Sequence, residues 1–389
     1  MRILYLHQFF LTGAGVGGTR SYEFARRFAA GGHAVRMVTA GRGTRDVEGI
    51  EVVGVRGGYG DYMGATAMGY PRRMAGFAGF AGAGAAVALR GPRPDVIYAT
   101  SPPLTMALPA LAAAARWRAP LVFEVRDLWP EAPIQMGALR RPALRRLARA
   151  LERLVYSRSA RIIALSPGIR SGVLAAGAPA GRVTLVPNAA NLALFSPALD
   201  RRAERERLGL AGGFVCSYFG AMGEANDVEQ AIEAAPLVGD VEFVLLGAGK
   251  LRPALEARAP PNVRFLDPVP DKSSVARLAA ASNACLTLFK DVPVLATGSP
   301  NKLFDTFAAG RAAIVNTDGW MRELVEQNEA GVYVRPRDPR DLAAKVAWLR
   351  DRPEEADRLG RNARALAERE FDLDTLAARA LRTLEEATG

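Results

Sequence analysis

A loop of small and turn-forming residues in the second half of the chain leads into a helix that begins near a lysine. The loop contains Ser299, Pro300 and Asn301, and Lys302 follows directly. The first turn of a helix has unpaired N–H groups and the positive end of the helix dipole, and both stabilise an anion. Lys302 adds a full positive charge. Taken by itself, the pattern is more typical of an ordinary helix start with an exposed lysine, and a site for a diphosphate is the alternative that the surrounding sequence has to support.

Glycines near the start of the chain match the spacing of dinucleotide-binding loops. Gly13, Gly15 and Gly18 fit G-x-G-x-x-G, but that site also needs a tight turn directly after the strand and an acid about 20 residues further on. The strand is expected to end near His7, and no acid ends the second strand. We therefore expect Gly17 and Gly18 to present backbone N–H groups to a diphosphate or a sugar hydroxyl instead. A flexible loop without a ligand is the alternative.

Three more glycines follow predicted strands in the second half of the chain. Gly220 ends one strand, and Gly247 and Gly249 separate another strand from a helix. Such glycines either let the backbone approach a ligand closely or only make a tight turn. Asn226, six residues after Gly220, is either a neutral hydrogen-bond donor to a ligand or the cap of the next helix.

Charged residues also gather at the end of a buried strand in the first half. Glu124 lies in the strand, and Arg126 and Asp127 follow it. An arginine cannot act as a base, but it can hold a phosphate or a sugar hydroxyl. The alternative is an internal Arg126–Asp127 pair that supports the loop.

Short apolar runs alternate with helical patterns along the whole chain. In the first half, the runs cover residues 3–7, 34–39, 50–55, 96–100, 121–125, 161–165 and 183–186. In the second half, they cover residues 214–219, 241–246, 263–266, 284–289, 312–316 and 331–334. Strands that are apolar throughout and separated by helices indicate a parallel sheet covered on both faces.

The fold class that follows is α/β, with two doubly wound Rossmann-like domains facing across a cleft. We place the first domain at residues 1–190 and the second at 191–370, and we expect a C-terminal helix at 371–389 to return to the first domain. Ligands of such sheets bind at the carboxyl ends of the strands, so the site is expected in the cleft. Among the predicted helices, residues 141–156 place Leu144 and Leu147 on one face with Val155, as expected of a helix that packs on a sheet.

The charge is distributed unevenly along the 389 residues, whose formal net charge is +11. Residues 1–190 hold 25 arginines, no lysine and 10 acidic residues, whereas residues 191–389 hold 26 basic and 30 acidic residues. The arginines of the first half include Arg72 and Arg73, directly before a Gly/Ala-rich apolar stretch. They suggest a surface for an anionic acceptor, lipid-linked or not, rather than for nucleic acid. Use of arginine in place of lysine throughout an alanine-rich sequence is the alternative.

Several of these segments together resemble glycosyltransferase family 4, whose members are retaining enzymes of the GT-B fold that use nucleotide-sugar donors. The resemblance covers essentially the whole chain. Its segments are Gly17-Gly18, Gly32-His33, residues 186–191 with Asn188, Gly247-Ala-Gly249, and residues 299–305 running into Gly310. Within the family, residues 101–104 and 124–131 resemble a bacterial subgroup that builds polysaccharides and includes amino-deoxysugar transferases acting on lipid-linked acceptors.

The resemblance implies a role for each half of the chain. The first domain would bind the acceptor, with Glu124, Arg72 and Arg73 in contact with it. The second would bind the nucleotide sugar. The implied donor-binding residues are Gly17, Gly18, Asn188, Gly220, Asn226, Gly247, Gly249, Ser299, Pro300, Asn301 and Asp305. The implied catalytic residues are Arg126, Asp127 and Lys302.

Three positions depart from the family's pattern. Asp305 stands at the second glutamate of the family's E-x7-E motif, which holds the nucleotide ribose, while Thr297 replaces the first. The basic pair that usually follows the strand ending near Gly220 is absent from residues 220–227. Arg126 and Asp127 stand where the family often has a His-Asp pair.

The function expected from the resemblance is hexosyl transfer with retention, from a UDP-linked sugar to a hydroxyl of a lipid-linked saccharide or cell-surface glycan precursor. No cofactor and no obligatory metal are expected, because no D-x-D pair stands in a metal-binding context. We expect a cytoplasmic protein without a nucleic-acid partner, either free or in peripheral contact with the inner face of the plasma membrane through its basic domain. The alternatives are a transferase for a soluble natural product, a nucleotide-sugar epimerase or oxidoreductase, and a non-catalytic sugar-binding protein.

Overall fold

The chain forms two compact units, each with its own sheet. The computed structural model describes residues 1–389 except 14, 16, 61–67, 211–212 and 269–270. Unit 1 consists of Met1–Thr12, Thr19–Pro187 and Asp374–Gly389. Unit 2 consists of Gly13–Gly18 and Asn188–Leu373.

Unit 1 is built on an eight-stranded sheet with the strand order β3-β4-β2-β1-β5-β6-β7-β8. The strands are β1 (Arg2–Leu6), β2 (Ala34–Ala40), β3 (Gly43–Val47), β4 (Ile50–Val55), β5 (Val96–Ser101), β6 (Leu121–Val125), β7 (Arg161–Ala164) and β8 (Val183–Leu185). All neighbours pair in parallel except β3 and β4. The sequence predicts every one of these strands except β3, because β3 is polar and exposed and has no apolar run to reveal it.

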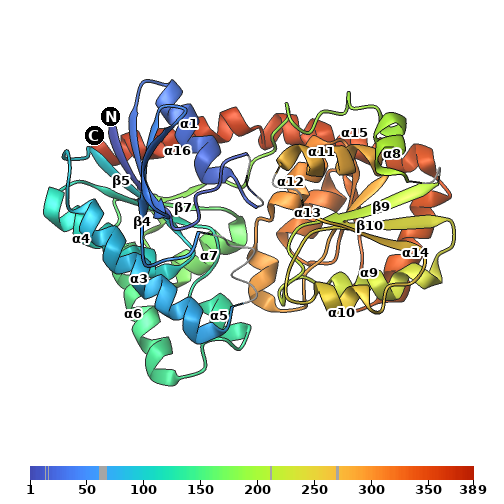
Figure 1. Ribbon diagram of the computed structural model, residues 1–389, viewed down its shortest axis with the longest axis horizontal. Coiled ribbons are helices and arrows are strands. Elements are labelled where there is room, and N and C mark those ends of the chain that lie inside the picture. The colour runs from blue at the N-terminus through green and yellow to red at the C-terminus, as the bar shows by residue number, and fades with distance from the viewer. Residues whose placement is uncertain (14, 16, 61–67, 211–212, 269–270) are drawn as a thin grey trace. The chain divides into compact units, whose positions relative to one another are not determined.

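Helices cover the sheet of unit 1 (Figure 1). They are α1 (Arg20–Ala30), α3 (Tyr70–Ala88), α4 (Ala107–Trp117), α5 (Glu131–Gln135), α6 (Pro142–Arg158), α7 (Pro167–Ala175) and most of α16 (Leu373–Thr388). Of these, α3, α4 and α6 pack side by side in that order. The return of the chain through α16 is held by ion pairs of Arg27 with Asp374 and of Arg161 with Glu386. Within the described residues, no helix combines the length and the apolar character needed to cross a bilayer.

One helix departs from its predicted packing. The sequence predicts that Leu144 and Leu147 pack on the sheet together with Val155, but only Val155 is buried, while Leu144 is 45% and Leu147 is 67% exposed. The buried residues of α6 all lie in its second half, and its first half extends past the helices that cover the sheet. A regular apolar stripe therefore does not guarantee a partner, since the partner depends on where the helix begins relative to the sheet.

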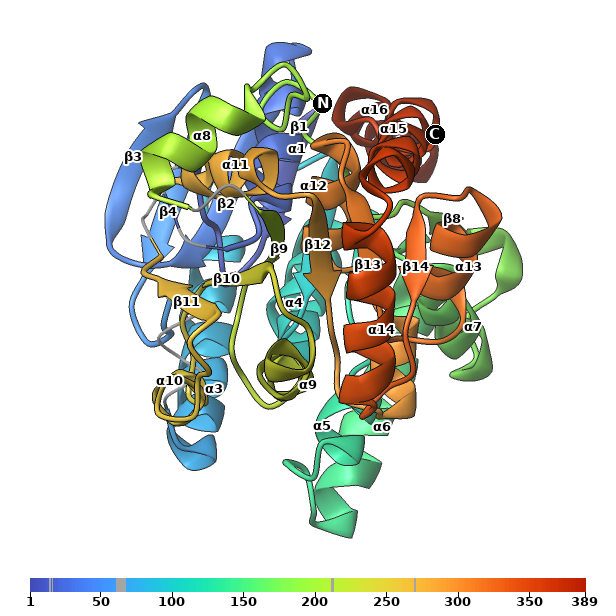
Figure 2. The same ribbon diagram turned by 90° about the vertical axis from the view of Figure 1, so that its right-hand side faces the viewer.

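Unit 2 contains a six-stranded sheet in which all neighbours are parallel. The order β11-β10-β9-β12-β13-β14 can be followed in Figure 2. The strands are β9 (Phe214–Phe219), β10 (Val241–Leu246), β11 (Val263–Leu266), β12 (Ala284–Thr287), β13 (Ala312–Val315) and β14 (Gly331–Tyr333). The sequence predicts all six, and their side chains such as Phe243, Leu286 and Ile314 form a buried core.

The helices of unit 2 connect these strands. They are α8 (Arg201–Leu208), α9 (Val228–Ala234), α10 (Arg252–Glu256), α11 (Lys272–Ala281), α12 (Asn301–Ala308), α13 (Trp320–Gln327), α14 (Pro339–Arg350) and α15 (Pro353–Glu370). Both cysteines, Cys216 of β9 and Cys285 of β12, are free and fully buried. The architecture of two parallel-sheet α/β units confirms the predicted fold class.

Candidate active site

The centre of the candidate site in unit 2 is Lys302, near the start of α12. Its Nζ lies 2.7 Å from Asn226 Oδ1 and 2.8 Å from the hydroxyl oxygen of Tyr218. Tyr218 comes from β9, the central strand beside β12, and its hydroxyl donates to the carbonyl of Ala221. The ammonium also lies over the rings of Tyr218 and Phe289, 4.3 and 5.0 Å from their centroids. Three segments of unit 2 thus hold one positive charge in place.

Lys302 has no carboxylate partner among the residues that the structure describes. Three other lysines of unit 2 differ: Lys250 pairs with Glu224, Lys272 with Asp305, and Lys290 with Asp227. Burial lowers the pKa of Lys302 from its usual value to about 7. Because hydroxyl, amide and ring groups only partly stabilise an ammonium, an anion brought by a ligand would supply the missing counter-charge.

Asn226 is a hydrogen-bond partner of Lys302 and not the cap of the next helix. The helix α9 is preceded by Asp227 at its N-cap position, without a side-chain capping bond. The side chain of Asn226 is 9% exposed and accepts from Lys302 through its oxygen. The predicted role of Asn226 as a helix cap is therefore wrong. Its predicted role as a donor to a ligand stays a prediction, and the bond from Lys302 to the side-chain oxygen orients the amide nitrogen that would donate.

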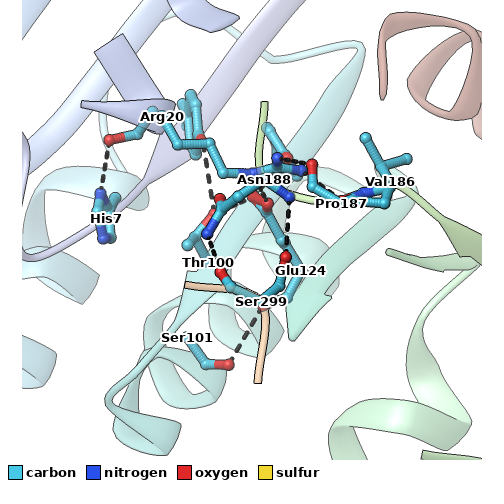
Figure 3. Close-up of polar contacts among 12 residues, drawn as sticks. His7, Arg20, Thr100, Ser101, Glu124, Val186, Pro187, Asn188 and Ser299 are labelled. Carbon is cyan, nitrogen blue, oxygen red and sulfur yellow. Dashed lines mark hydrogen bonds and ion pairs between the residues drawn. The ribbon is translucent and has the colours of Figure 1, made fainter. Parts of the chain in front are cut away.

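Asn188 and Ser299 come from segments more than a hundred residues apart and bind each other. The backbone N–H of Asn188 donates to Ser299 Oγ at 3.1 Å, and its side-chain nitrogen donates to the Ser299 carbonyl (Figure 3). Both residues are buried. The side-chain oxygen of Asn188 is buried without a hydrogen-bond partner among the described residues. Ser299 and the next residue, Pro300, hold the loop that leads into α12 at Asn301.

Asp305, one turn after Lys302, is an internal member of an ion pair. Its side chain is 6% exposed and its Oδ1 lies 3.1 Å from Nζ of Lys272, the first residue of α11. Burial raises the pKa of Asp305, and Lys272 only partly opposes this. Lys272 also lies over the ring of Phe195. The acid predicted to meet the ribose is thus held in position by a lysine that the sequence does not reveal.

The glycines after β9 and β10 allow the two loops that follow these strands to pack backbone against backbone. A Cβ at Gly247 would lie 1.9 Å from the carbonyl oxygen of Gly220, and one at Gly249 would lie 2.4 Å from that of Met222. Gly220 itself has a φ of 144° and faces Lys302, whose Nζ would be 3.4 Å from an added Cβ. Packing between the loops alone requires Gly247 and Gly249, whereas Gly220 also makes room for the lysine.

In unit 1, Glu124 is a buried counter-ion. Its carboxylate pairs with the guanidinium of Arg20, and it accepts from the hydroxyls of Tyr98 and Thr100 at 2.5 and 2.9 Å (Figure 3). Burial opposes the charge, but Arg20 and Arg126 hold the pKa of Glu124 below its usual value. Glu124 is 0% exposed. It is therefore an internal residue, in contrast to the acceptor contact predicted for it.

Arg20 extends this hydrogen-bond network to Val186 and Pro187, where the chain passes from unit 1 into unit 2. Its guanidinium donates to the carbonyl oxygens of Val186, at 3.0 Å, and of Pro187. Pro187 is the last residue before unit 2 begins at Asn188. One buried arginine thus joins the first helix, the strand end of β6 and the segment that leaves unit 1.

The other polar residues at this edge of the sheet follow β1 and β6. His7 is buried, and its Nδ1 lies 2.9 Å from Ser21 Oγ. Burial, together with the nearby charge of Arg126, lowers the pKa of His7 well below its usual value. Arg126 is half-buried and Asp127 is exposed. A neutral imidazole, a guanidinium and an accessible carboxylate therefore lie near the carboxyl ends of the strands.

The remaining predicted residues lie elsewhere. Gly17 is exposed and Gly18 half-buried, directly before Thr19 at the N-cap of α1, and residues 14 and 16 of that glycine run lie outside the described residues. Arg72 is exposed and Arg73 half-buried in the first turn of α3. In the described part of the chain, no group of three or more His, Cys, Asp or Glu side chains is arranged to hold a metal ion.

The sequence alone does not point to Tyr218, Phe289, Lys272 or Arg20. Tyr218 and Phe289 stand in or next to apolar strand runs that read as core. Arg20 and Lys272 each begin a helix, where charged residues are usually solvated. Only their partners from distant segments show that Tyr218, Phe289 and Lys272 contact Lys302 or Asp305 in unit 2. The partner of Arg20 within unit 1 is Glu124.

The architecture of two parallel-sheet α/β units agrees with the comparison with known families. Residues 15–189 match the model of the glycosyl transferase 4-like domain, and residues 213–352 match that of the glycosyl transferases group 1. The two models together cover most of the chain. The chain belongs to the glycosyltransferases of the GT-B fold.

Individual relatives are distant. A D-inositol 3-phosphate glycosyltransferase from Thermomonospora curvata is 28% identical over 283 residues, which make up 64% of this chain and 62% of that protein. The match thus spans less than two thirds of the relative's length. Among solved structures, sucrose-phosphate synthase from Thermosynechococcus elongatus has a TM-score of 0.78 at 17% identity, covering 98% of this chain and 97% of that one. HepE from Anabaena in complex with UDP-glucose has a TM-score of 0.76 at 18% identity, covering 99% of each chain. At these identities the structural likeness shows the fold alone.

Proposed function

We propose that this protein is a retaining hexosyltransferase that moves a sugar from a UDP-linked donor to a hydroxyl of a lipid-linked saccharide in bacterial polysaccharide synthesis. The observation that carries the donor half is Lys302, an ammonium surrounded by neutral groups at the start of a helix. A nucleoside diphosphate is the ligand class that fits this site. A relative crystallised with UDP-glucose supports UDP as the carrier.

Unit 2 supplies the groups for the diphosphate in this proposal. The β-phosphate meets Lys302 and the free N–H groups of the first turn of α12, and the amide nitrogen of Asn226 is a further donor. The free side-chain oxygen of Asn188 lies beside the same loop and would accept a hydrogen bond from a hydroxyl of the donor. Asp305, fixed by Lys272, is the group for the ribose. Placed charges of this kind stabilise the leaving diphosphate without a basic pair after Gly220.

Unit 1 supplies the acceptor half. Asp127 is the accessible carboxylate after β6, and Arg126 beside it is a hydrogen-bond donor for an anionic or hydroxylated acceptor. In a same-face reaction the donor bond loosens first, and the departing diphosphate takes the proton of the incoming hydroxyl. The protein then contributes position and charge rather than a nucleophile. The basic surface of unit 1, including Arg72 and Arg73, is proposed to meet the inner face of the plasma membrane.

Calorimetric titration with UDP, GDP and ADP tests the donor half. We expect UDP to bind, and an absence of binding by all three nucleotides at millimolar concentration would refute the transferase. A screen of UDP-sugars for slow hydrolysis then identifies the donor, because water replaces the acceptor in such a reaction. The anomeric proton signals of the product report whether configuration is retained.

The reaction is proposed to need no metal ion. Turnover measured before and after dialysis against a chelator tests this, and the expected result is unchanged turnover. Loss of turnover that added Mg²⁺ or Mn²⁺ restores would contradict the metal-free reaction and leave the donor proposal intact.

A further inference from the structure

The helix α6 exposes large apolar side chains that a protein normally buries. Leu144, Leu147 and Leu154 of this helix are 45%, 67% and 43% exposed. Their spacing of three and seven residues places them on one side of the helix, with the half-buried Leu151 between them. Leu108 of the neighbouring α4 is 49% exposed. Outside this pair of packed helices, the one other large apolar side chain exposed to this degree in the described residues is Leu237, which stands alone in unit 2.

The charge around these leucines has one sign. The helices α3, α4 and α6 together carry eight arginines and a single acidic residue, Glu152, which is buried. One of the arginines, Arg149, pairs with Glu131 of α5. On α6 the exposed arginines Arg146 and Arg153 accompany the leucine stripe along its length. Exposed leucines next to exposed arginines are the combination that binds an interface between hydrocarbon and anionic headgroups.

The geometry of α6 also allows a flat partner to reach it. The first half of the helix, from Pro142 to Leu147, is exposed except for the half-buried Arg145. In Figures 1 and 2, this end of α6 (blue-green) lies at the outer edge of unit 1. The outward residues of the adjacent α3, such as Ala75, Ala78 and Gly82, are small and uncharged. No acidic group on these three helices would repel an anionic surface.

We propose that the leucine stripe of α6, together with Leu108 of α4, is a membrane-docking surface for bilayers that contain anionic lipids. The leucines enter the boundary between headgroups and acyl chains, and the arginines contact the lipid phosphates. The inference deepens the proposed function and rests on it for the lipid-linked nature of the acceptor. A second copy of the chain is a poorer occupant, because a symmetric dimer would place this positive surface against itself.

Co-sedimentation of the full-length protein with vesicles tests the surface. We expect binding to an equal mixture of phosphatidylcholine and phosphatidylglycerol, and little binding to phosphatidylcholine alone. The triple variant Leu144→Ser/Leu147→Ser/Leu154→Ser is expected to lower the partition coefficient by more than about tenfold, since three apolar side chains no longer leave water. The matched control is Leu237→Ser, which removes an equally exposed leucine of unit 2 and should leave binding unchanged.

The arginines are tested separately. Arg146→Gln/Arg153→Gln should weaken binding by roughly tenfold or more, since each arginine near an anionic surface contributes about 1 kcal/mol. Arg42→Gln/Arg45→Gln, at exposed arginines in and beside β3, is the control and should change it little. Circular dichroism and UDP affinity confirm that each variant is folded.

Three outcomes would overturn the docking surface: no vesicle binding by the native protein, unchanged binding by the leucine variant, or an equal loss in the Leu237→Ser control. Binding that is lost together with self-association in sedimentation velocity would assign the face to a second copy instead. These results are distinct from failure of the proposed function. That failure appears as absent UDP binding, whether or not vesicles bind.

Discussion

The ammonium nitrogen of Lys302 lies 2.7 Å from the side-chain oxygen of Asn226, so the charge at the centre of the candidate site rests against a neutral amide. Lys250, Lys272 and Lys290 of the same unit form ion pairs with carboxylates instead. Neutral acceptors hold the ammonium in position without satisfying its charge. This difference singles out Lys302 and leads to the first two predictions.

Replacing Lys302 should weaken nucleotide binding. Lys302→Ala removes a charge-assisted contact to the diphosphate, so UDP should bind more weakly, by roughly 1.5–3 kcal/mol. Calorimetry measures this directly. Lys345→Ala, in α14 of the same unit, is the control and should bind UDP as the native protein does. Equal affinity of the Lys302 variant and the native protein would remove Lys302 from the site.

The affinity for UDP should depend on pH because of the same residue. Burial lowers the pKa of Lys302 to about 7, so above pH 7 the free protein increasingly carries a neutral amine. Binding of the diphosphate requires the ammonium and therefore takes up a proton. The dissociation constant should rise with pH in this range, by up to about tenfold per pH unit. The dependence should disappear in Lys302→Ala, and an equally steep profile in that variant would assign the proton uptake to another group.

The buried pair of Arg20 and Glu124 should be important for stability. Arg20→Met leaves the Glu124 carboxylate buried without its counter-ion and frees the carbonyls of Val186 and Pro187, so the free energy of unfolding should fall by about 3–5 kcal/mol. Denaturant unfolding of unit 1 measures the loss. Arg2→Met breaks an exposed pair with Asp95 of the same unit and should cost less than about 1 kcal/mol. Similar losses in the two variants would contradict a structural role for Arg20.

The contact between the loops after β9 and β10 should not tolerate a side chain. Gly247→Ala places a methyl group 1.9 Å from the carbonyl oxygen of Gly220, and the loops must separate to admit it. The expected loss of stability is about 1–3 kcal/mol, with weaker UDP binding because Gly220 faces Lys302. Gly223→Ala is the matched control, since a Cβ there meets nothing within 4 Å. A native-like melting temperature in Gly247→Ala would show that the loops can move apart freely.

Most of the fold is predictable from the sequence because its signals are local. Parallel strands buried on both faces must be apolar throughout, so runs such as residues 214–219 identify themselves. The edge strand β3 is polar and exposed, so it has no apolar run from which the sequence could predict it. The stripe of Leu144 and Leu147 is equally clear in sequence, but its exposure is not, because helix patterning says nothing about where the sheet beneath it ends.

The candidate site divides in a similar way. The sequence by itself determined two α/β units and the loop before α12 with Lys302. These features are predictable because turns, helix starts and local charge depend on residues that are adjacent in the sequence. Only the tertiary structure decided what surrounds them. It joined Asn188 to Ser299 and Tyr218 to Lys302, and it buried Glu124 against Arg20. Those contacts join segments 84 to 111 residues apart. The packing of whole strands and helices sets such distances, and no local pattern records them.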